Sequence, residues 1–91
     1  MALLKCKISK GLRETEKTVE VGDYSGRREF LPVDGEMIAH RGGQSYLPVR
    51  VLQIDKAKKG AVVALPVEAD SGAHRIWVKL SDLIEFSEAP V

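Results

Sequence analysis

The chain has 91 residues, of which 44% are hydrophobic and 30% charged, and 14 Lys and Arg against 13 Asp and Glu give a formal net charge of +1. A chain of this length supports only one core, so we expect a single β domain over residues 1–91. The balanced charge excludes a plainly polycationic protein, and the single cysteine, Cys6, excludes an internal disulfide and a multi-cysteine metal site.

Neither a leader nor a membrane span is expected from the hydropathy pattern. Lys5 and Lys7 interrupt the apolar start of the chain. The longest apolar run, residues 61–67, falls well short of the about 20 residues that a bilayer requires. We therefore expect a cytoplasmic protein with no membrane association.

Alternation of apolar and polar residues predicts strands along the whole chain. Leu4, Cys6 and Ile8 alternate with polar neighbours, which predicts a first strand whose apolar side faces the core. Residues 18–21 and 28–33 predict a hairpin, and residues 36–40 suit either a strand or a helical turn.

The clearest predicted hairpin joins residues 46–55 to residues 61–68. Its connection, residues 56–60, contains three lysines and ends at Gly60, which suits a positive φ. After a polar turn at residues 70–72, residues 75–79 predict a further strand.

The triplet Leu-Pro-Val occurs at residues 31–33, 47–49 and 65–67. Proline gives no N–H to a ladder, so a strand proline is confined to an edge, a strand start or a bulge. We interpret the three prolines as protection of strand edges against aggregation. The alternative is an edge that recruits a partner, including a homo-oligomer formed through strand edges.

A weak internal repeat appears when the chain is shifted by 46 residues. The matches join Ile8 to Ile54, Lys10 to Lys56, Val21 to Val67, Ser25-Gly26 to Ser71-Gly72, and Ile38 to Ile84. This number of matches is too small to establish a repeat from sequence. A barrel of two duplicated halves therefore remains the second fold hypothesis.

The second half of the chain resembles the closing portion of SH3-like small barrels. The resemblance rests on residues 75–84, Arg-Ile-Trp-Val-Lys-Leu-Ser-Asp-Leu-Ile. It implies a strand, one 3₁₀ turn over residues 80–83 and a last strand over residues 84–86. The chain lacks the aromatic-rich opening and paired tryptophans of signalling SH3 domains, so recognition of PxxP ligands is not implied. The first fold hypothesis is an all-β, SH3-like barrel or roll of five to seven strands with one short 3₁₀ turn.

Arg75, Trp77 and Lys79 share one side of their predicted strand, opposite Ile76 and Val78. If the aliphatic pair faces the core, Trp77 lies near the surface between two cations, where it can anchor a peptide or stack a base. These three residues are the predicted ligand-binding face. The alternative is that Trp77 closes one end of the barrel as part of the core.

A second set of residues predicts sequence-tolerant nucleic-acid or anion binding. Basic residues cluster in three predicted loops, and Gly42-Gly43 offers backbone N–H groups for an anion. The set consists of Arg27, Arg28, His40, Arg41, Lys56, Lys58 and Lys59. Acidic residues interleaved with these cations make this the alternative function.

No motif for catalysis, a cofactor or a metal site is present in the sequence. Cys6 falls on the apolar side of its strand, where a thiol behaves as a small hydrophobe. Neither a phosphate-binding loop nor a dinucleotide motif occurs. We therefore expect a non-catalytic binding or assembly module without cofactor or metal, and a protein or peptide partner ahead of nucleic acid.

Overall fold

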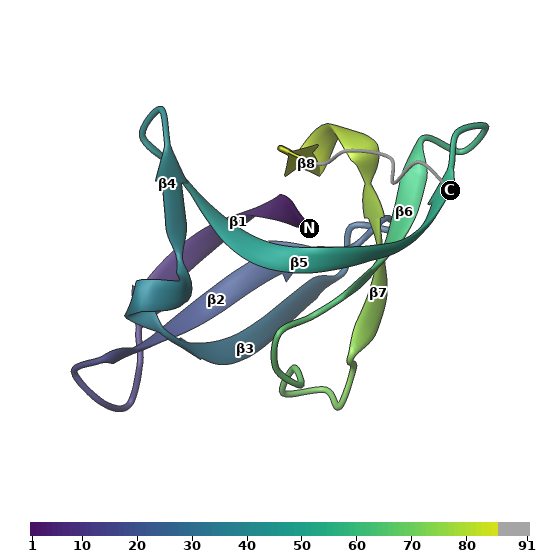
Figure 1. Cartoon of the computed structure of the whole chain (residues 1–91). Helices are drawn as coiled ribbons and strands as arrows, with labels where there is room; N and C mark the ends of the chain where they lie inside the picture. The colour runs from purple at the N-terminus through teal and green to yellow at the C-terminus, as the bar shows by residue number, and fades with distance from the viewer. Residues whose placement is uncertain (86–91) are drawn as a thin grey trace.

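The structure, a computed structural model, describes residues 1–85 and consists of strands joined by short turns (Figure 1). The strands are β1 (Ala2–Lys10), β2 (Glu16–Gly22), β3 (Arg28–Asp34), β4 (Ala39–Arg41), β5 (Gln44–Asp55), β6 (Gly60–Ala64), β7 (Arg75–Lys79) and β8 (Leu83–Ile84). The 3₁₀ turns are η1 (Gly35–Met37) and η2 (Leu80–Asp82). The all-β prediction is confirmed, although residues 1–85 contain eight strands and two such turns, more than expected.

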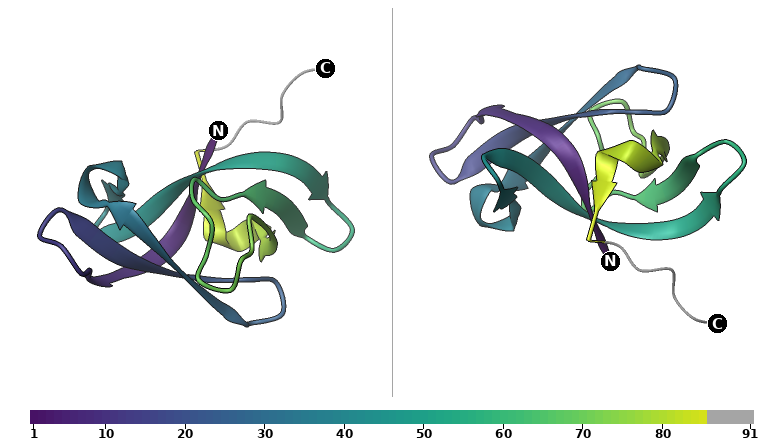
Figure 2. Two further views of the ribbon diagram at one scale, coloured as in Figure 1. Left: turned by 90° about the horizontal axis from the view of Figure 1, so that it is seen from below. Right: turned by 90° about the horizontal axis from the view of Figure 1, so that it is seen from above.

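The strands form one curled antiparallel sheet in the order β3-β2-β1-β5-β6-β7, with β4 paired to β5 and β8 paired to β1. Each of the two long central strands, β1 and β5, changes its main partner along its length. Residues 2–6 of β1 pair with β5 and residues 7–10 with β2, while residues 45–49 of β5 pair with β1 and residues 50–55 with β6. The sheet therefore curls into a half-barrel, which the two views in Figure 2 show.

The core of the half-barrel is aliphatic. Strands β3 and β7 alternate strictly between exposed and buried side chains, as period-two patterning requires. The largest fully buried side chains are Leu4, Val19, Val21, Leu31, Leu47, Val63 and Val78. Burying each of them stabilises the fold by about 1.5–3 kcal/mol.

Three sequence predictions about local structure are wrong. Ile8 is 39% exposed, because it lies beyond Cys6, where β1 leaves its pairing with β5. Strand β6 ends at Ala64 instead of residue 68, since Pro66 has no N–H to continue the ladder. In the connection before β6 the positive φ belongs to Lys59, at 54°, and not to Gly60.

Two further predictions are resolved in part. Residues 36–40 contain both alternatives, because η1 is followed after Ile38 by β4. The predicted 3₁₀ turn and last strand are present as η2 and β8, but β8 covers Leu83–Ile84 and Phe86 lies outside the described residues.

The prolines of the three Leu-Pro-Val triplets lie where no ladder bond is lost. The carbonyl of Phe30 accepts from Asp70 N at 2.8 Å and thus points away from β2, so the nitrogen of Pro32 also points to the outer edge of β3. Pro48 lies between the segment of β5 paired with β4 and the segment paired with β6. Pro66 follows the end of β6.

The two halves of the chain contain the same order of elements. Each half consists of three strands, a 3₁₀ turn and a short strand, and the short last strand of each half pairs with the long first strand of the other. In the central β1–β5 ladder the pairs Ala2↔Val49 and Leu3↔Pro48 exchange under the 46-residue shift, while the ladder continues past them only toward Cys6↔Ser45.

The turns of the two halves are equivalent in detail. Asp23 N bonds to Arg27 O at 2.8 Å, and Ala69 N bonds to Ala73 O at 2.9 Å. Gly26 and Gly72 both have a φ of 92°. These turns occupy the same position in each half, although few of their side chains match.

Each equivalent turn also reaches the edge strand of the other half. Tyr24 N donates to Trp77 O at 2.7 Å, and Asp70 N donates to Phe30 O at 2.8 Å. Trp77 of β7 therefore corresponds to Phe30 of β3. These two bonds connect the outer strands of the curled sheet to the opposite half.

A circular permutant that begins at Gln44 and joins its original ends through a glycine-rich linker is expected to fold. Residues 42–43 form the connection between equivalent halves, and Ile84 already lies opposite Leu3 in the β8–β1 pair. Amide-resolved NMR and urea unfolding measure the outcome. A permutant that begins at Pro48 is the control, because it cuts β5 within its pairing to β1 and should lose cooperative unfolding. An unfolded Gln44 permutant would contradict the equivalence of the two connections.

Candidate ligand-binding face

Strand β7 presents the predicted residues Arg75, Trp77 and Lys79 on its exposed side, while Ile76 and Val78 face the core. Trp77 is 39% exposed, which excludes the alternative that its side chain is part of the core. The expected alternation is therefore confirmed for all five residues of the strand.

Tyr24, from the turn between β2 and β3, is fixed beside Trp77. Its hydroxyl donates to the carbonyl oxygen of Lys58 at 2.5 Å, and its backbone N–H donates to Trp77 O. Its ring packs on the backbone of Gly60, where an added Cβ would lie 3.0 Å from ring carbons. Glycine is thus required at residue 60 for close approach and not for a positive φ.

The turn that carries Tyr24 is held by Asp23. Its Oδ1 accepts from Ser25 N at 2.9 Å, from Ser25 Oγ at 2.7 Å and from Arg27 N at 2.9 Å. Partial burial raises the pKa of this carboxyl, but the hydrogen bonds from Ser25 and Arg27 outweigh it and hold the pKa below its usual range. The carboxylate stays ionised at neutral pH and orders the turn.

Tyr24 and Trp77 border an open hollow of about 490 Å³, the Trp77 groove. It lies between the β2–β3 turn, β3 and β7, and is lined by Asp23, Tyr24, Ser25, Glu29, Lys58, Ala73, Arg75, Ile76 and Trp77. Glu29 is only 8% exposed, and its Oε1 accepts from Ser71 Oγ at 2.6 Å. The groove therefore combines two exposed aromatic rings with a shielded, hydrogen-bonded carboxylate.

A second hollow, of about 460 Å³, adjoins the first across Tyr24 and Lys58. This lysine hollow is lined by Tyr24, Lys58, Lys59, Lys79, Leu80 and Ser81. Lys58 belongs to both hollows, and its Nζ lies 5.9 Å from the centroid of the Trp77 ring, within the range of a cation–π contact.

The structure separates the residues of the alternative nucleic-acid set. The β4–β5 turn and the loop of residues 56–59 lie at opposite ends of β5. Arg28 Nε pairs with Glu20 Oε2 at 2.6 Å. Of this set, Lys58 and Lys59 share a hollow with Lys79 of the predicted ligand-binding face.

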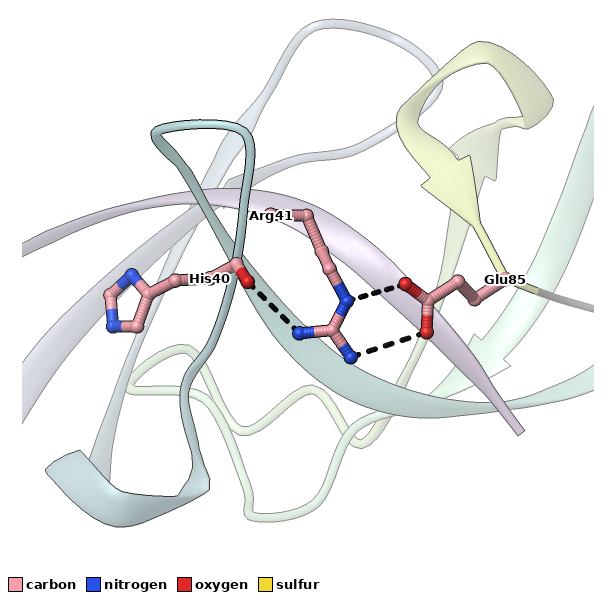
Figure 3. Close-up of polar contacts among 3 residues, drawn as sticks. All are labelled: His40, Arg41 and Glu85. Carbon is pink, nitrogen blue, oxygen red and sulfur yellow. Dashed lines mark hydrogen bonds and ion pairs between the residues drawn. The ribbon is translucent and has the colours of Figure 1, made fainter.

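Arg41 also has an acidic partner (Figure 3). Its Nε and Nη2 donate to the two carboxylate oxygens of Glu85 at 2.6 and 3.3 Å, and its Nη1 donates to the carbonyl oxygen of His40 at 2.9 Å. The hydrogen bond and charge of Glu85 raise the pKa of the Arg41 guanidinium above its ordinary value. Arg41, which was predicted to bind an anion beside Gly42-Gly43, is thus paired with a carboxylate of the same chain.

Groups with chemical reactivity lie elsewhere. Cys6 is buried in the core, and desolvation raises the pKa of its thiol to about 11. The imidazole Nδ1 of His40 lies 3.4 Å from Ser45 Oγ because the two residues are partners in the β4–β5 pair. Among residues 1–85 no three His, Cys, Asp or Glu side chains are grouped closely enough to hold a metal ion.

Sequence reasoning missed Tyr24 and Glu29. Tyr24 precedes Ser25-Gly26, which is one of the repeat matches, but the equivalent residue is Asp70 and gives no sign of an aromatic contact. Glu29 lies in phase with Leu31 and Val33 in its strand, which places it inward without indicating its contact to Ser71.

Comparison with protein-family models, with curated proteins and with solved structures found no match in any of the three. No helical segment of residues 1–85 has the length and apolar character needed to cross a membrane.

Gly60→Ala is expected to destabilise the protein by about 1–3 kcal/mol, because the new methyl group would press on the Tyr24 ring at 3.0 Å and on Val78 O at 3.3 Å. Gly35→Ala is the matched control, since its Cβ would make only ordinary contacts from 3.5 Å outward. Urea unfolding measures both, and equal effects of the two substitutions would contradict the packing of Tyr24 on Gly60.

Trp77, the only tryptophan, is expected to show red-shifted emission that acrylamide quenches in the native state. Trp77→Ala should cost less than the about 3–5 kcal/mol of a fully buried aromatic truncation. Ile76→Ala on the inward side of the same strand provides the comparison and should cost about 2–5 kcal/mol. Blue-shifted, quencher-resistant emission would show that the indole is buried.

Proposed function

We propose that this protein is a non-catalytic binding module of the SH3-like class and that its ligand contacts the Trp77 groove and the adjoining lysine hollow. The observation that carries the proposal is the pair of exposed rings, Tyr24 and Trp77, held together at a concave surface. Ligand sites are typically concave, rich in apolar and aromatic surface, and supplied with a few placed polar groups.

Rigidity supports the same conclusion. Three contacts fix Tyr24, namely its bonds to Lys58 O and Trp77 O and its packing on Gly60. A preorganised aromatic surface loses little conformational entropy when a ligand binds.

The SH3-like assignment rests on the succession of β7, η2 and β8, which has the strand, 3₁₀ turn, strand order of that class. Barrels of this class have many unrelated functions, so the class of ligand depends on the residues of the site and not on the fold. The absence of catalysis is proposed because the buried Cys6 thiol, with its pKa of about 11, is protonated and unreactive at neutral pH.

A homo-oligomer through strand edges is the less favoured form of assembly. The outer edge of β3 contains Pro32, and the carbonyls of Phe30 and Trp77 already accept bonds from the turns of the opposite half. Both edge strands therefore lack part of the free backbone N–H and C=O groups that pairing with a second copy would need.

The test is an amide-resolved NMR titration with a short DNA, a short RNA and a peptide pool, each at two salt concentrations. We expect shifts confined to residues around Tyr24, Lys58 and Trp77, and at least one ligand that Trp77→Ala weakens while the fold is kept. Phe30→Ala is the matched control, because Phe30 is the equivalent exposed aromatic of the other half. Binding elsewhere, or equal loss in both variants, would reject this face.

A further inference from the structure

The two adjoining hollows differ in charge. The Trp77 groove is lined by the carboxylates of Asp23 and Glu29 and by the cations Lys58 and Arg75, so its formal charges balance. The lysine hollow contains three ammonium groups, the Ser81 hydroxyl and no carboxylate among its lining residues. An anionic group is therefore attracted more strongly to the lysine hollow than to the groove.

The carboxylates of the groove are occupied within the fold. Asp23 bonds to its own turn, and Glu29 is shielded and bonded to Ser71. What the groove presents to a ligand is the ring surface of Trp77 and Tyr24. A flat neutral ring suits this surface, because aromatic faces stack with little regard to the identity of the partner ring.

The cations around the hollow remain available. Among residues 1–85, Lys59, Lys79 and Arg75 have no carboxylate within the 4.0 Å of an ion pair, whereas Arg28 and Arg41 do. Lys58 lies over Trp77 at the boundary of the two hollows. The cations of this part of the surface that form no ion pair thus lie next to the exposed rings of Tyr24 and Trp77.

The equivalent face of the other half is an internal comparison. It has the same backbone bond from turn to edge strand, but Asp70 replaces Tyr24 and Phe30 replaces Trp77. Arg28, the counterpart of Arg75, is paired with Glu20, and Pro32 replaces Lys79. The cationic and aromatic set is therefore not required by the backbone, since the fold forms this face once without it.

From this division of charge we infer that the ligand is a single-stranded nucleic acid, with a base against Trp77 in the groove and the neighbouring phosphates over Lys58, Lys59 and Lys79. The inference rests on the binding function proposed above and names its ligand class. Aromatic platforms beside a cationic track are the general means by which proteins hold single strands without reading sequence.

The probes are the octamers dT8 and rU8, and the readout is quenching of the single tryptophan, which stacking produces directly. Affinity should fall with salt at a logarithmic slope of about −1.4 to −2.1, as expected for two to three phosphates on a single strand. An octamer of abasic sugar phosphates should bind on the order of ten-fold more weakly, because it cannot stack. Comparing dT8 with rU8 separates a DNA from an RNA ligand.

Five variants test the assignment with fluorescein-labelled dT8. Trp77→Ala should weaken binding on the order of ten-fold, and Phe30→Ala should not. Lys79→Ala and Lys59→Gly should each reduce the salt slope by about 0.7, and the glycine also suits the positive φ at that residue. Lys10→Ala, an exposed lysine at the far end of β1, should leave the slope unchanged.

Equal binding of the abasic and dT8 octamers, or a slope that Lys79→Ala does not change, would overturn the inference. Tighter binding of an acidic peptide such as Ac-Gly-Glu-Tyr-Glu-Gly-amide at the same face would also overturn it and would leave the binding function in place. If neither octamer nor any peptide in the pool shifts the resonances around Trp77, both the inference and the proposed function fail.

Discussion

The antiparallel pairing of β1 with β5 is the contact on which the rest of the structure depends. It places Leu4 opposite Leu47, two fully buried side chains of the core, and it joins the first half of the chain to the second. Because each long strand continues into a second ladder, one hairpin extends from either side of the central pair. Right-handed twist then curls both hairpins, so the turn of each half meets the edge strand of the other.

Symmetry of the backbone explains why the candidate face is informative. The same turn-to-edge bond is formed twice, once by Tyr24 and once by Asp70. Only the first is accompanied by an aromatic ring seated on a glycine and by a cluster of lysines. Side chains that differ between equivalent positions are not dictated by the fold, which makes them candidates for a role in binding.

Net charge is a poor guide to this surface. The chain as a whole carries +1, and two of its arginines, Arg28 and Arg41, are paired locally with glutamates. The cations that remain near Trp77 are concentrated by the fold and not by the sequence, because Lys58 and Lys79 come from different strands and loops. Local fields of this kind guide association even when the total charge is close to zero.

The sequence by itself indicated most of the strands, the two sides of β7 and the positions of the main turns. These features follow from period-two alternation and turn chemistry, which act between near neighbours. The tertiary structure alone decided that Ile8 is exposed, that Tyr24 lies against Lys58 thirty-four residues away, and that the predicted cations divide between separate surfaces. These outcomes depend on strand register and on the curl of the sheet, which are fixed by packing between distant segments and leave no local pattern in the sequence.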